Sequence, residues 1–291
     1  MHTNLIILAG GASSRMKKEA AVGTKLSQRE VEEANQRSKA LISIDPSGRP
    51  LLDYLLYNAK QAGYKHIYLV TGEENTMFKA RYGKEMHGND FHGLIVHYAI
   101  QRIPSGRKKP LGTADALFQA LVQYPELQNH SFTVCNSDNL YSIEALRLLK
   151  TSKMAPNALI GYDREALLFD EDRIAKFALV VLDRDHYLLD IIEKPSRQDI
   201  QELRKASKTL YVSMNVFRFD GTMFFNYLKH CPLHPIRNEK ELPTALLNMI
   251  KDHPRSTFTL PLSEHVPDLT SKHDIAIMKT YIQNMDLSAW S

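Results

Sequence analysis

The first residues that could do chemistry lie between Leu8 and Met16, where Leu-Ala-Gly-Gly-Ala-Ser-Ser-Arg-Met follows a short apolar run. Gly10 and Gly11 would let backbone N–H groups approach an oxyanion without a Cβ in the way. Arg15 adds a planar set of donors that suits phosphate. The segment has neither the Gly-x-Gly-x-x-Gly dinucleotide pattern nor the Gly-Lys-Ser/Thr of a P-loop, which excludes those two classes. A tight strand-to-helix turn with a solvated arginine is the alternative interpretation.

Two further aspartates lie in short segments with turn residues. Asp138 lies in Asn-Ser-Asp-Asn, and Asp268 lies in Val-Pro-Asp-Leu-Thr. Taken alone, an Asx turn at Asp138 and a helix cap region at Asp268 are the favoured interpretations.

Alternating strands and helices must position these segments in the first half of the chain. Short apolar runs bounded by turn residues have strand length, and runs with helical spacing lie between them. Polar and apolar residues do not alternate along these predicted strands, which indicates that both faces are buried. We therefore expect a mostly parallel sheet covered by helices on both faces, an α/β fold. The predicted strands are 5–9, 67–70, 95–99 and 132–134, and the helical patterns cover 51–59, 116–121 and 143–149.

The pattern changes after residue 150. Strand-like stretches with fewer helices between them predict an antiparallel extension, and helical patterns then resume. One long polar stretch, Lys17–Ser38, is interpreted as a flexible or helical surface insertion. The later strands are expected at 174–182, 188–192 and 211–219, and the later helices at 222–229, 242–251 and 273–284.

The segment at residues 8–16 resembles the Leu-Ala-Gly-Gly-x-x-x-Arg-Met/Leu signature of nucleotidyltransferases, which transfer a nucleoside monophosphate from a nucleoside triphosphate. Five later segments occur in the order of the sugar-1-phosphate nucleotidylyltransferases, also called nucleotide-sugar pyrophosphorylases. The resemblance covers nearly the whole chain. Each segment alone is a weak indication of the family, but six of them in the same order are a strong one. The five are Ser38–Leu41 with Pro50-Leu51-Leu52, Gln101 with Pro110–Ala114, Asn136–Asn139, Glu193-Lys194-Pro195, and Val266–Thr270.

The resemblance implies a Rossmann-like three-layer α/β/α fold with a mostly parallel mixed sheet and an antiparallel sugar-binding extension. It implies one continuous catalytic domain, with a nucleotide-binding half at 1–150 and a sugar-phosphate-binding half with the C-terminal helices at 151–291. The reaction would convert a nucleoside triphosphate and a sugar-1-phosphate into a nucleoside diphosphate sugar and pyrophosphate, with Mg²⁺. The nucleophile is a phosphate with a second pKa of about 6, so no general base is needed. The chemistry requires charge neutralisation instead.

The same resemblance assigns roles to residues. Arg15 and Lys39 would neutralise the triphosphate and the departing pyrophosphate, and Lys194 would neutralise the phosphate of the sugar. Asp138 and Asp268 would share the Mg²⁺ ion, which needs few protein ligands when phosphates and waters complete its octahedron. They are far apart in sequence, so they can share an ion only if the fold brings both turns to one edge of a sheet. Asp138 is counted with the catalytic residues. The expected nucleotide-binding residues are Leu8, Ala9, Gly10, Gly11, Gln101, Gly112 and Thr113, and the expected sugar-binding residues are Asn139, Glu193 and Asn215.

Three features depart from the family pattern. Ser137 replaces the glycine that usually precedes the metal aspartate, and Asn215 replaces a glycine of the sugar-contacting strand. Asparagine tolerates left-handed geometry better than most residues, so that turn can survive. The Lys17–Ser38 stretch lengthens the loop between Arg15 and Lys39, and we predict that it orders as a lid when triphosphate binds.

Composition limits the remaining possibilities. Hydrophobic residues make up 43% and charged residues 24%, as in globular proteins, and the net charge of +4 is too small to indicate a nucleic-acid surface. The opening apolar run at 5–9 is far too short to span a membrane, and two cysteines indicate a reducing cytoplasm. A homo-oligomer is possible.

Alternative functions are a molybdenum-cofactor guanylyltransferase, a methylerythritol-phosphate cytidylyltransferase, and a non-catalytic nucleotide-sugar-binding protein. The nucleobase and the sugar stay open.

Overall fold

The computed structural model of the chain describes residues 2–11, 16–17, 26–285, 287 and 290. Its strands form one mixed sheet in the order β10-β6-β9-β5-β1-β2-β4-β3, and β7 and β8 extend it beside β9. The strands are β1 (Asn4–Leu8), β2 (His66–Thr71), β3 (Asn89–Phe91), β4 (Leu94–Ile100), β5 (Ser131–Asn136), β6 (Asn157–Asp163), β7 (Ala178–Leu182), β8 (Leu188–Ile192), β9 (Tyr211–Asp220) and β10 (Thr257–Leu262).

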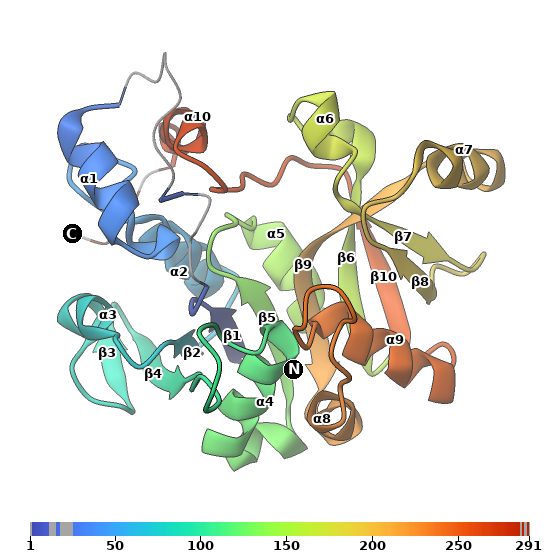
Figure 1. Ribbon diagram of the computed structural model, residues 1–291, viewed down its shortest axis with the longest axis horizontal. Coiled ribbons are helices and arrows are strands. Elements are labelled where there is room, and N and C mark those ends of the chain that lie inside the picture. Colours follow the sequence, from blue (N-terminus) through green and yellow to red (C-terminus); the bar gives the residue numbers. More distant parts are fainter. Residues whose placement is uncertain (1, 12–15, 18–25, 286, 288–289, 291) are drawn as a thin grey trace.

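Helices cover both faces of this sheet (Figure 1). The longer ones are α1 (Gln28–Gln36), α2 (Leu51–Gln61), α3 (Thr76–Tyr82), α4 (Thr113–Gln123), α5 (Ile143–Thr151), α6 (Glu171–Ile174), α7 (Arg197–Ala206), α8 (Gly221–Lys229), α9 (Leu242–Asp252) and α10 (His273–Ile282). Three short 3₁₀ helices are η1 (Lys39–Leu41), η2 (Pro125–Asn129) and η3 (Arg164–Ala166).

The core confirms the three-layer prediction. Side chains of β1 alternate between two hydrophobic clusters: Leu5 and Ile7 pack into the cluster of α2 and α5, and Ile6 packs into the cluster of α4, α8 and α9. All three side chains are fully buried. A strand buried on both faces needs apolar residues at consecutive positions, which explains the uninterrupted apolar run of the sequence.

The strands of the first half of the chain are parallel except for β3, which runs antiparallel to β4, and the second half contains both orientations. Strand β1 pairs in parallel with β2 and β5, and β2 pairs in parallel with β4. Strand β9 runs antiparallel between β5 and β6, and β7 runs antiparallel to β8 and β9. These pairings confirm the predicted antiparallel extension. The sheet is continuous across residue 150, and the assignment of one half to each substrate stays a prediction.

One predicted strand is wrong in its first part. Residues 171–174 form α6, and β7 begins only at Ala178. The side chain of Asp170 accepts a hydrogen bond from the backbone N–H of Arg173, which caps this helical turn and prevents an extended start. The sequence also gave no prediction for β3, β6, β10, α3 or α7.

The polar stretch Lys17–Ser38 is helical in its second part. Helix α1 begins with a capping box, in which Ser27 and Glu30 satisfy each other's backbone N–H groups. Glu30 also forms an ion pair with Lys279 of α10. Residues 18–25 lie outside the described residues, and the predicted ordering of this stretch with triphosphate stays a prediction.

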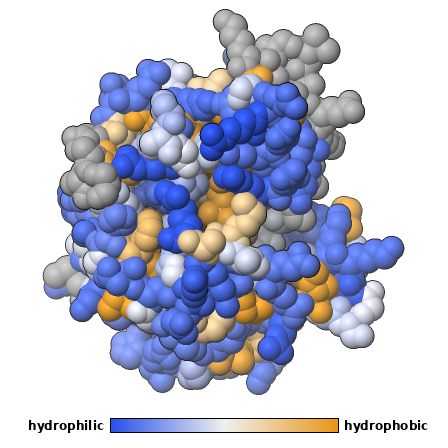
Figure 2. Space-filling model, turned by 90° about the vertical axis from the view of Figure 1, so that its left-hand side faces the viewer, coloured by the Kyte–Doolittle hydropathy of each residue, from blue (hydrophilic) through white to orange (hydrophobic). Residues whose placement is uncertain are grey.

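The hydrophobic core lies between the layers of the fold, and the surface seen from one side is mixed in polarity. Hydrophobic residues are scattered among hydrophilic ones on the face seen in Figure 2. Among the described residues, no helix is both long enough and apolar enough to cross a bilayer.

Candidate active site

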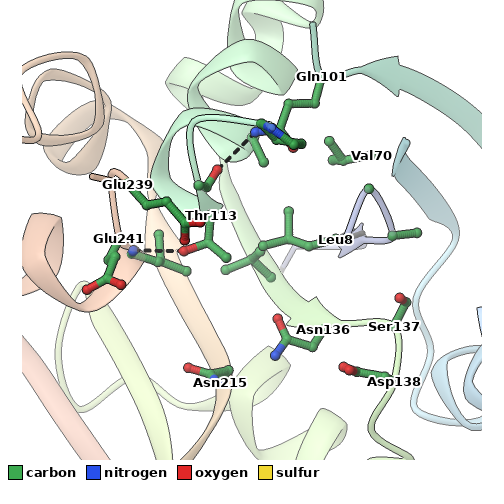
Figure 3. Close-up of a pocket in the computed structure, with 18 of the residues that line it drawn as sticks. Leu8, Val70, Gln101, Thr113, Asn136, Ser137, Asp138, Asn215, Glu239 and Glu241 are labelled. Atoms are coloured by element: carbon green, nitrogen blue, oxygen red, sulfur yellow. Dashed lines mark hydrogen bonds between the residues drawn. The ribbon is translucent and has the colours of Figure 1, made fainter. Parts of the chain in front are cut away.

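A cavity of about 450 Å³ lies at the carboxyl edge of the parallel strands. The segments that follow β1, β4 and β5 form its floor and sides, because parallel strands end at one edge of the sheet. Figure 3 shows Leu8 near the centre, Gln101 above it, and Ser137 and Asp138 on the side opposite Glu239 and Glu241. All seven predicted nucleotide-binding residues line this cavity: Leu8, Ala9, Gly10, Gly11, Gln101, Gly112 and Thr113.

The glycine turn after β1 passes close to Gln101. A Cβ added at Gly10 would lie 3.3 Å from Gln101 Oε1, whereas one at Gly11 would meet nothing within 4 Å. Arg15, which the sequence predicts beside this turn, lies outside the described residues. The structure therefore places the two glycines at the cavity and leaves the contribution of Arg15 a prediction.

Gln101 is held in one orientation. It is buried, and its Nε2 donates to the backbone carbonyl of Gly112 at 2.9 Å and to Asp115 Oδ2 at 3.2 Å. Both amide hydrogens are therefore committed to the protein, and Oε1 remains on the side of Gly10 as an acceptor. Gly112 is the N-cap residue of α4, and Asp115 in the first turn of that helix holds the Gln101 amide.

A wall from the loop between α8 and α9 closes the cavity on the other side. Gly112 has φ +114°, and a Cβ there would lie 2.4 Å from the carbonyl oxygen of Lys240. Lys240 donates its N–H to Leu111 O at 2.6 Å and accepts from Ala114 N at 3.0 Å. Thr113 Oγ1 accepts from Leu242 N at 3.0 Å. The sequence offered no motif for this wall, and its charged residues are typical of a solvated loop; those that line the cavity are Arg237, Glu239 and Glu241.

Lys39 and Asp138 form an ion pair at the mouth of the cavity. Lys39 Nζ lies 2.8 Å from Asp138 Oδ2, and the side chains are 11% and 27% exposed. Helix η1 supplies the lysine, and the turn after β5 supplies the aspartate. Ser137 precedes this aspartate with its N–H bonded to Leu8 O at 3.2 Å, and it does not have a positive φ. A glycine is therefore not required at position 137.

The fold brings the turn of Asp268 beside that of Asp138. Asn139 and Asp268 form an antiparallel bridge. Leu269 N donates to Asp138 O at 2.8 Å, and Leu140 N donates to Pro267 O at 3.0 Å. Two residues distant in sequence are thus neighbours at one edge of the sheet, as a shared ion would require.

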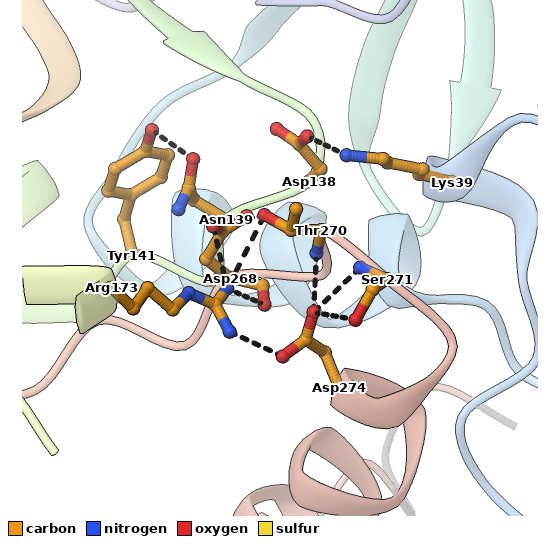
Figure 4. A network of polar contacts seen from close by, with 9 residues as sticks. All are labelled: Lys39, Asp138, Asn139, Tyr141, Arg173, Asp268, Thr270, Ser271 and Asp274. Carbon is orange, nitrogen blue, oxygen red and sulfur yellow. Dashed lines mark hydrogen bonds and ion pairs between the residues drawn. The ribbon is translucent and has the colours of Figure 1, made fainter. Parts of the chain in front are cut away.

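One carboxylate oxygen of Asp268 nevertheless accepts hydrogen bonds from two side chains (Figure 4). Its Oδ2 accepts from Arg173 Nη2 at 2.8 Å and from Thr270 Oγ1 at 2.5 Å. Burial and the neighbouring Asp138 carboxylate raise the pKa of Asp268, and the donors oppose that shift without cancelling it. Arg173 is a residue of this site that no sequence motif indicated.

A second cavity of about 680 Å³ adjoins the first through Asp138. Asn139, Asn215 and Asp268 line it, and Asn215 lines the first cavity as well. Asn215 has φ +56°, so the left-handed geometry expected at this departure from the family pattern is present.

The Glu193-Lys194-Pro195 motif follows β8 at the surface. Glu193 lines the first cavity, where Arg237 pairs with its carboxylate. Lys194 is exposed, has φ +49°, and lines neither cavity. Its predicted contact with the phosphate of a sugar stays a prediction.

The donor set limits which metal could bind. Within the part of the chain that the structure describes, no group of three or more His, Cys, Asp or Glu side chains is arranged to hold an ion. Asp138 is partly exposed at the junction of both cavities. One or two carboxylates beside a phosphate site fit Mg²⁺, which keeps waters and substrate oxygens as ligands.

Known proteins resemble this chain in sequence and in structure. The sequence model of the family described as nucleotidyl transferase matches residues 33–261, a range that contains Lys39, Gln101, Asp138 and Lys194. The small subunit of glucose-1-phosphate adenylyltransferase of Triticum aestivum, a chloroplastic or amyloplastic protein, is 23% identical over 202 residues. The match covers 68% of this chain but only 39% of the wheat protein.

Two solved structures share the fold over 98% of this chain. One is a putative glucose-1-phosphate thymidylyltransferase from Bacillus anthracis in complex with a sucrose, with a TM-score of 0.65, 18% identity and 96% of its length covered. The other is a UDP-glucose pyrophosphorylase complexed with UDP-glucose, with a TM-score of 0.69, 14% identity and its full length covered. At these identities the likeness shows a common fold.

Proposed function

Because this chain belongs to the nucleotidyl transferase family, we propose that it transfers a nucleoside monophosphate from a nucleoside triphosphate to a sugar-1-phosphate. The products are a nucleoside diphosphate sugar and pyrophosphate. The named relatives act on, or are complexed with, sugars or sugar nucleotides, which supports a sugar phosphate as the acceptor.

One observation carries this proposal: Asp138, paired with Lys39, lies where two cavities meet. A transfer between two phosphate esters requires two binding sites that adjoin at the reacting phosphorus, with opposite charges there to handle phosphate and cation. The first cavity has the glycine turn and the fixed amide of Gln101, which suit a nucleotide. The second has Asn139 and Asn215, whose amides suit the hydroxyl groups of a sugar.

The chemistry needs no activated side-chain nucleophile. A phosphate oxygen of the sugar-1-phosphate attacks the α-phosphorus of the triphosphate, forming a new P–O bond. The bond between the α-phosphorus and the oxygen bridging to the β-phosphorus breaks, and pyrophosphate leaves with the electron pair. The attacking phosphate is mostly dianionic at neutral pH because its second pKa is about 6.

The residues therefore act through charge and position. The ammonium group of Lys39 moves from Asp138 to the triphosphate. Arg15 and Lys194 are the further cations that the family resemblance implies at this site. Asp138 would hold the Mg²⁺ ion, and the ion would supply electrostatic stabilisation of the negative charge that develops on the phosphate oxygens. Gln101 Oε1 accepts a hydrogen bond from the nucleobase.

A panel of five nucleoside triphosphates against glucose-, mannose- and N-acetylglucosamine-1-phosphate tests the activity through coupled detection of pyrophosphate. We expect one pair to react in the presence of Mg²⁺ and Asp138→Asn to abolish its turnover. Asp90→Asn, an exposed aspartate of β3, is the matched control. Nucleotide binding without pyrophosphate release from any pair would refute an enzyme and favour a nucleotide-sugar-binding protein.

We also propose a location in the cell and an oligomeric state for this protein. Both cysteines, Cys135 and Cys231, are free and buried, which supports a cytoplasmic protein. A homo-oligomer is the family-based expectation, and light scattering on the purified chain tests it.

A further inference from the structure

Arg173 occupies the position from which a cation would neutralise Asp268. Its Nη2 donates to Asp268 Oδ2 at 2.8 Å and to the backbone carbonyl of the same residue at 2.9 Å. Its Nη1 donates to Asp274 Oδ1. One guanidinium thus joins the carboxylate of Asp268, in the turn before α10, to that of Asp274, in the first turn of α10, and Figure 4 shows it lying between them.

Both carboxylate oxygens of Asp274 accept hydrogen bonds in this arrangement. Asp274 Oδ2 accepts from Thr270 N at 3.0 Å, from Ser271 N at 2.6 Å and from Ser271 Oγ at 3.0 Å. The guanidinium carbon of Arg173 also lies 4.3 Å from the ring centre of Phe169. The side chains of Asp268 and Asp274 are 13% and 6% exposed.

Asp138 is held quite differently. Lys39 pairs with it, its side chain is 27% exposed, and it lines both cavities. A lysine ammonium is a point charge on a flexible stem and can transfer to a phosphate in one step. Arg173 cannot lose its proton, and leaving Asp268 would break several hydrogen bonds at once.

Charge also separates the two carboxylates. An Mg²⁺ ion bound by Asp268 would lie close to a guanidinium that shares the same carboxylate, so the two cations would repel each other. At Asp138 the competing cation is displaced to the triphosphate, where it is needed.

We propose that Asp138 is the only carboxylate among the described residues that binds the divalent cation, and that Arg173 keeps Asp268 out of the coordination shell and supplies a fixed positive charge in its place. This departs from the family resemblance, which gives both aspartates to the ion. It rests on the proposed function, because that reaction is what requires the cation. Arg173 is accordingly a positioning residue, which fixes the turn that packs against Asp138.

Direct binding of Mn²⁺ alone, followed by the electron paramagnetic resonance signal of the free ion, tests the proposal without any turnover. In the full chain, Asp138→Asn should weaken Mn²⁺ binding about tenfold or more, and Asp268→Asn should change it less than about threefold. Arg173→Met should tighten it by about threefold to tenfold, because Asp268 becomes available. Adding Asp268→Asn to Arg173→Met should restore the original affinity. Asp90→Asn is the control.

A tenfold loss of Mn²⁺ affinity in Asp268→Asn would overturn the proposal, and so would a lack of Mn²⁺ binding by the unaltered chain. Thermal unfolding checks each variant. If Arg173→Met does not fold, the comparison of Asp268→Asn with Asp138→Asn decides alone. The proposed function and this inference can fail independently. If no substrate pair of the panel gives product, the proposed function is wrong. If product forms but Mn²⁺ binding requires Asp268, only this inference is wrong.

Discussion

Replacing Gly112 by alanine should both strain the backbone and push the cavity wall away. The residue has φ +114° and ψ −176°, a conformation that is essentially restricted to glycine, which costs about 1–3 kcal/mol for another residue. The new Cβ would also lie 2.4 Å from Lys240 O, and an overlap of this kind costs about 1–3 kcal/mol. The sum is a loss of about 2–6 kcal/mol in the free energy of unfolding.

Substitutions at two other glycines separate the cost of the backbone conformation from the cost of the overlap. Gly106 has φ +81° with nothing within 4 Å of an added Cβ, so Gly106→Ala should lose about 1 kcal/mol from conformation alone. Gly72 has neither a positive φ nor a neighbour within 4 Å, so Gly72→Ala should stay within about 0.5 kcal/mol of the unaltered chain. Urea unfolding monitored by circular dichroism gives all three values.

The same substitution tests the wall itself. Because Lys240 must move, Gly112→Ala should also weaken nucleoside triphosphate binding, measured by calorimetry at a temperature where the variant is folded. A loss of stability no greater than that of Gly106→Ala would refute the close approach of Lys240. Unchanged nucleotide affinity in a destabilised variant would refute the role of this loop as a wall of the nucleotide site.

Three further outcomes follow from other parts of the molecule. Burial lowers the pKa of His97 from 6.5 to about 4, so the unfolded chain binds more protons in that interval and stability should fall as the pH drops from 6.5 towards 4. His97→Gln should flatten this part of a stability-against-pH curve, and an unchanged slope would contradict the burial of the ring. Burial raises the pKa of the Cys135 and Cys231 thiols, so both should resist alkylation at pH 8 until the chain unfolds; rapid labelling of the folded protein would contradict their burial. Asn215→Ala should lose about 1 kcal/mol in urea unfolding and Asn215→Gly none, because of the positive φ; equal losses would point to a side-chain contact instead.

The central strands were predictable because their burial leaves a local signature. The apolar runs at 5–9 and 132–134 became β1 and β5, since a strand covered on both faces must be apolar throughout. Helix α7 escaped prediction for the opposite reason. Among the described side chains of this helix, only Ile200 and Leu203 pack against the core, so it has no apolar stripe of the usual width.

The candidate site was predictable where backbone shape determines it. The glycine turn, Gln101 and the turn of Asp138 each follow a predicted strand, and the ends of parallel strands must meet. Arg173 and Arg237 could not be found in this way, because each gains its role from a partner far away in sequence. Any exposed arginine of an irregular segment has the same local pattern.

Strand β9 has a consequence for how this molecule can move. It is hydrogen-bonded to β5 on one side and to β6 on the other, so it joins the two halves of the sheet along their length. Swinging one half against the other would break at least one of these two ladders, a far greater cost than the repacking at an ordinary hinge. The scaffold therefore behaves as a rigid frame, and any grip on a substrate has to come from the segments that extend beyond the strand ends.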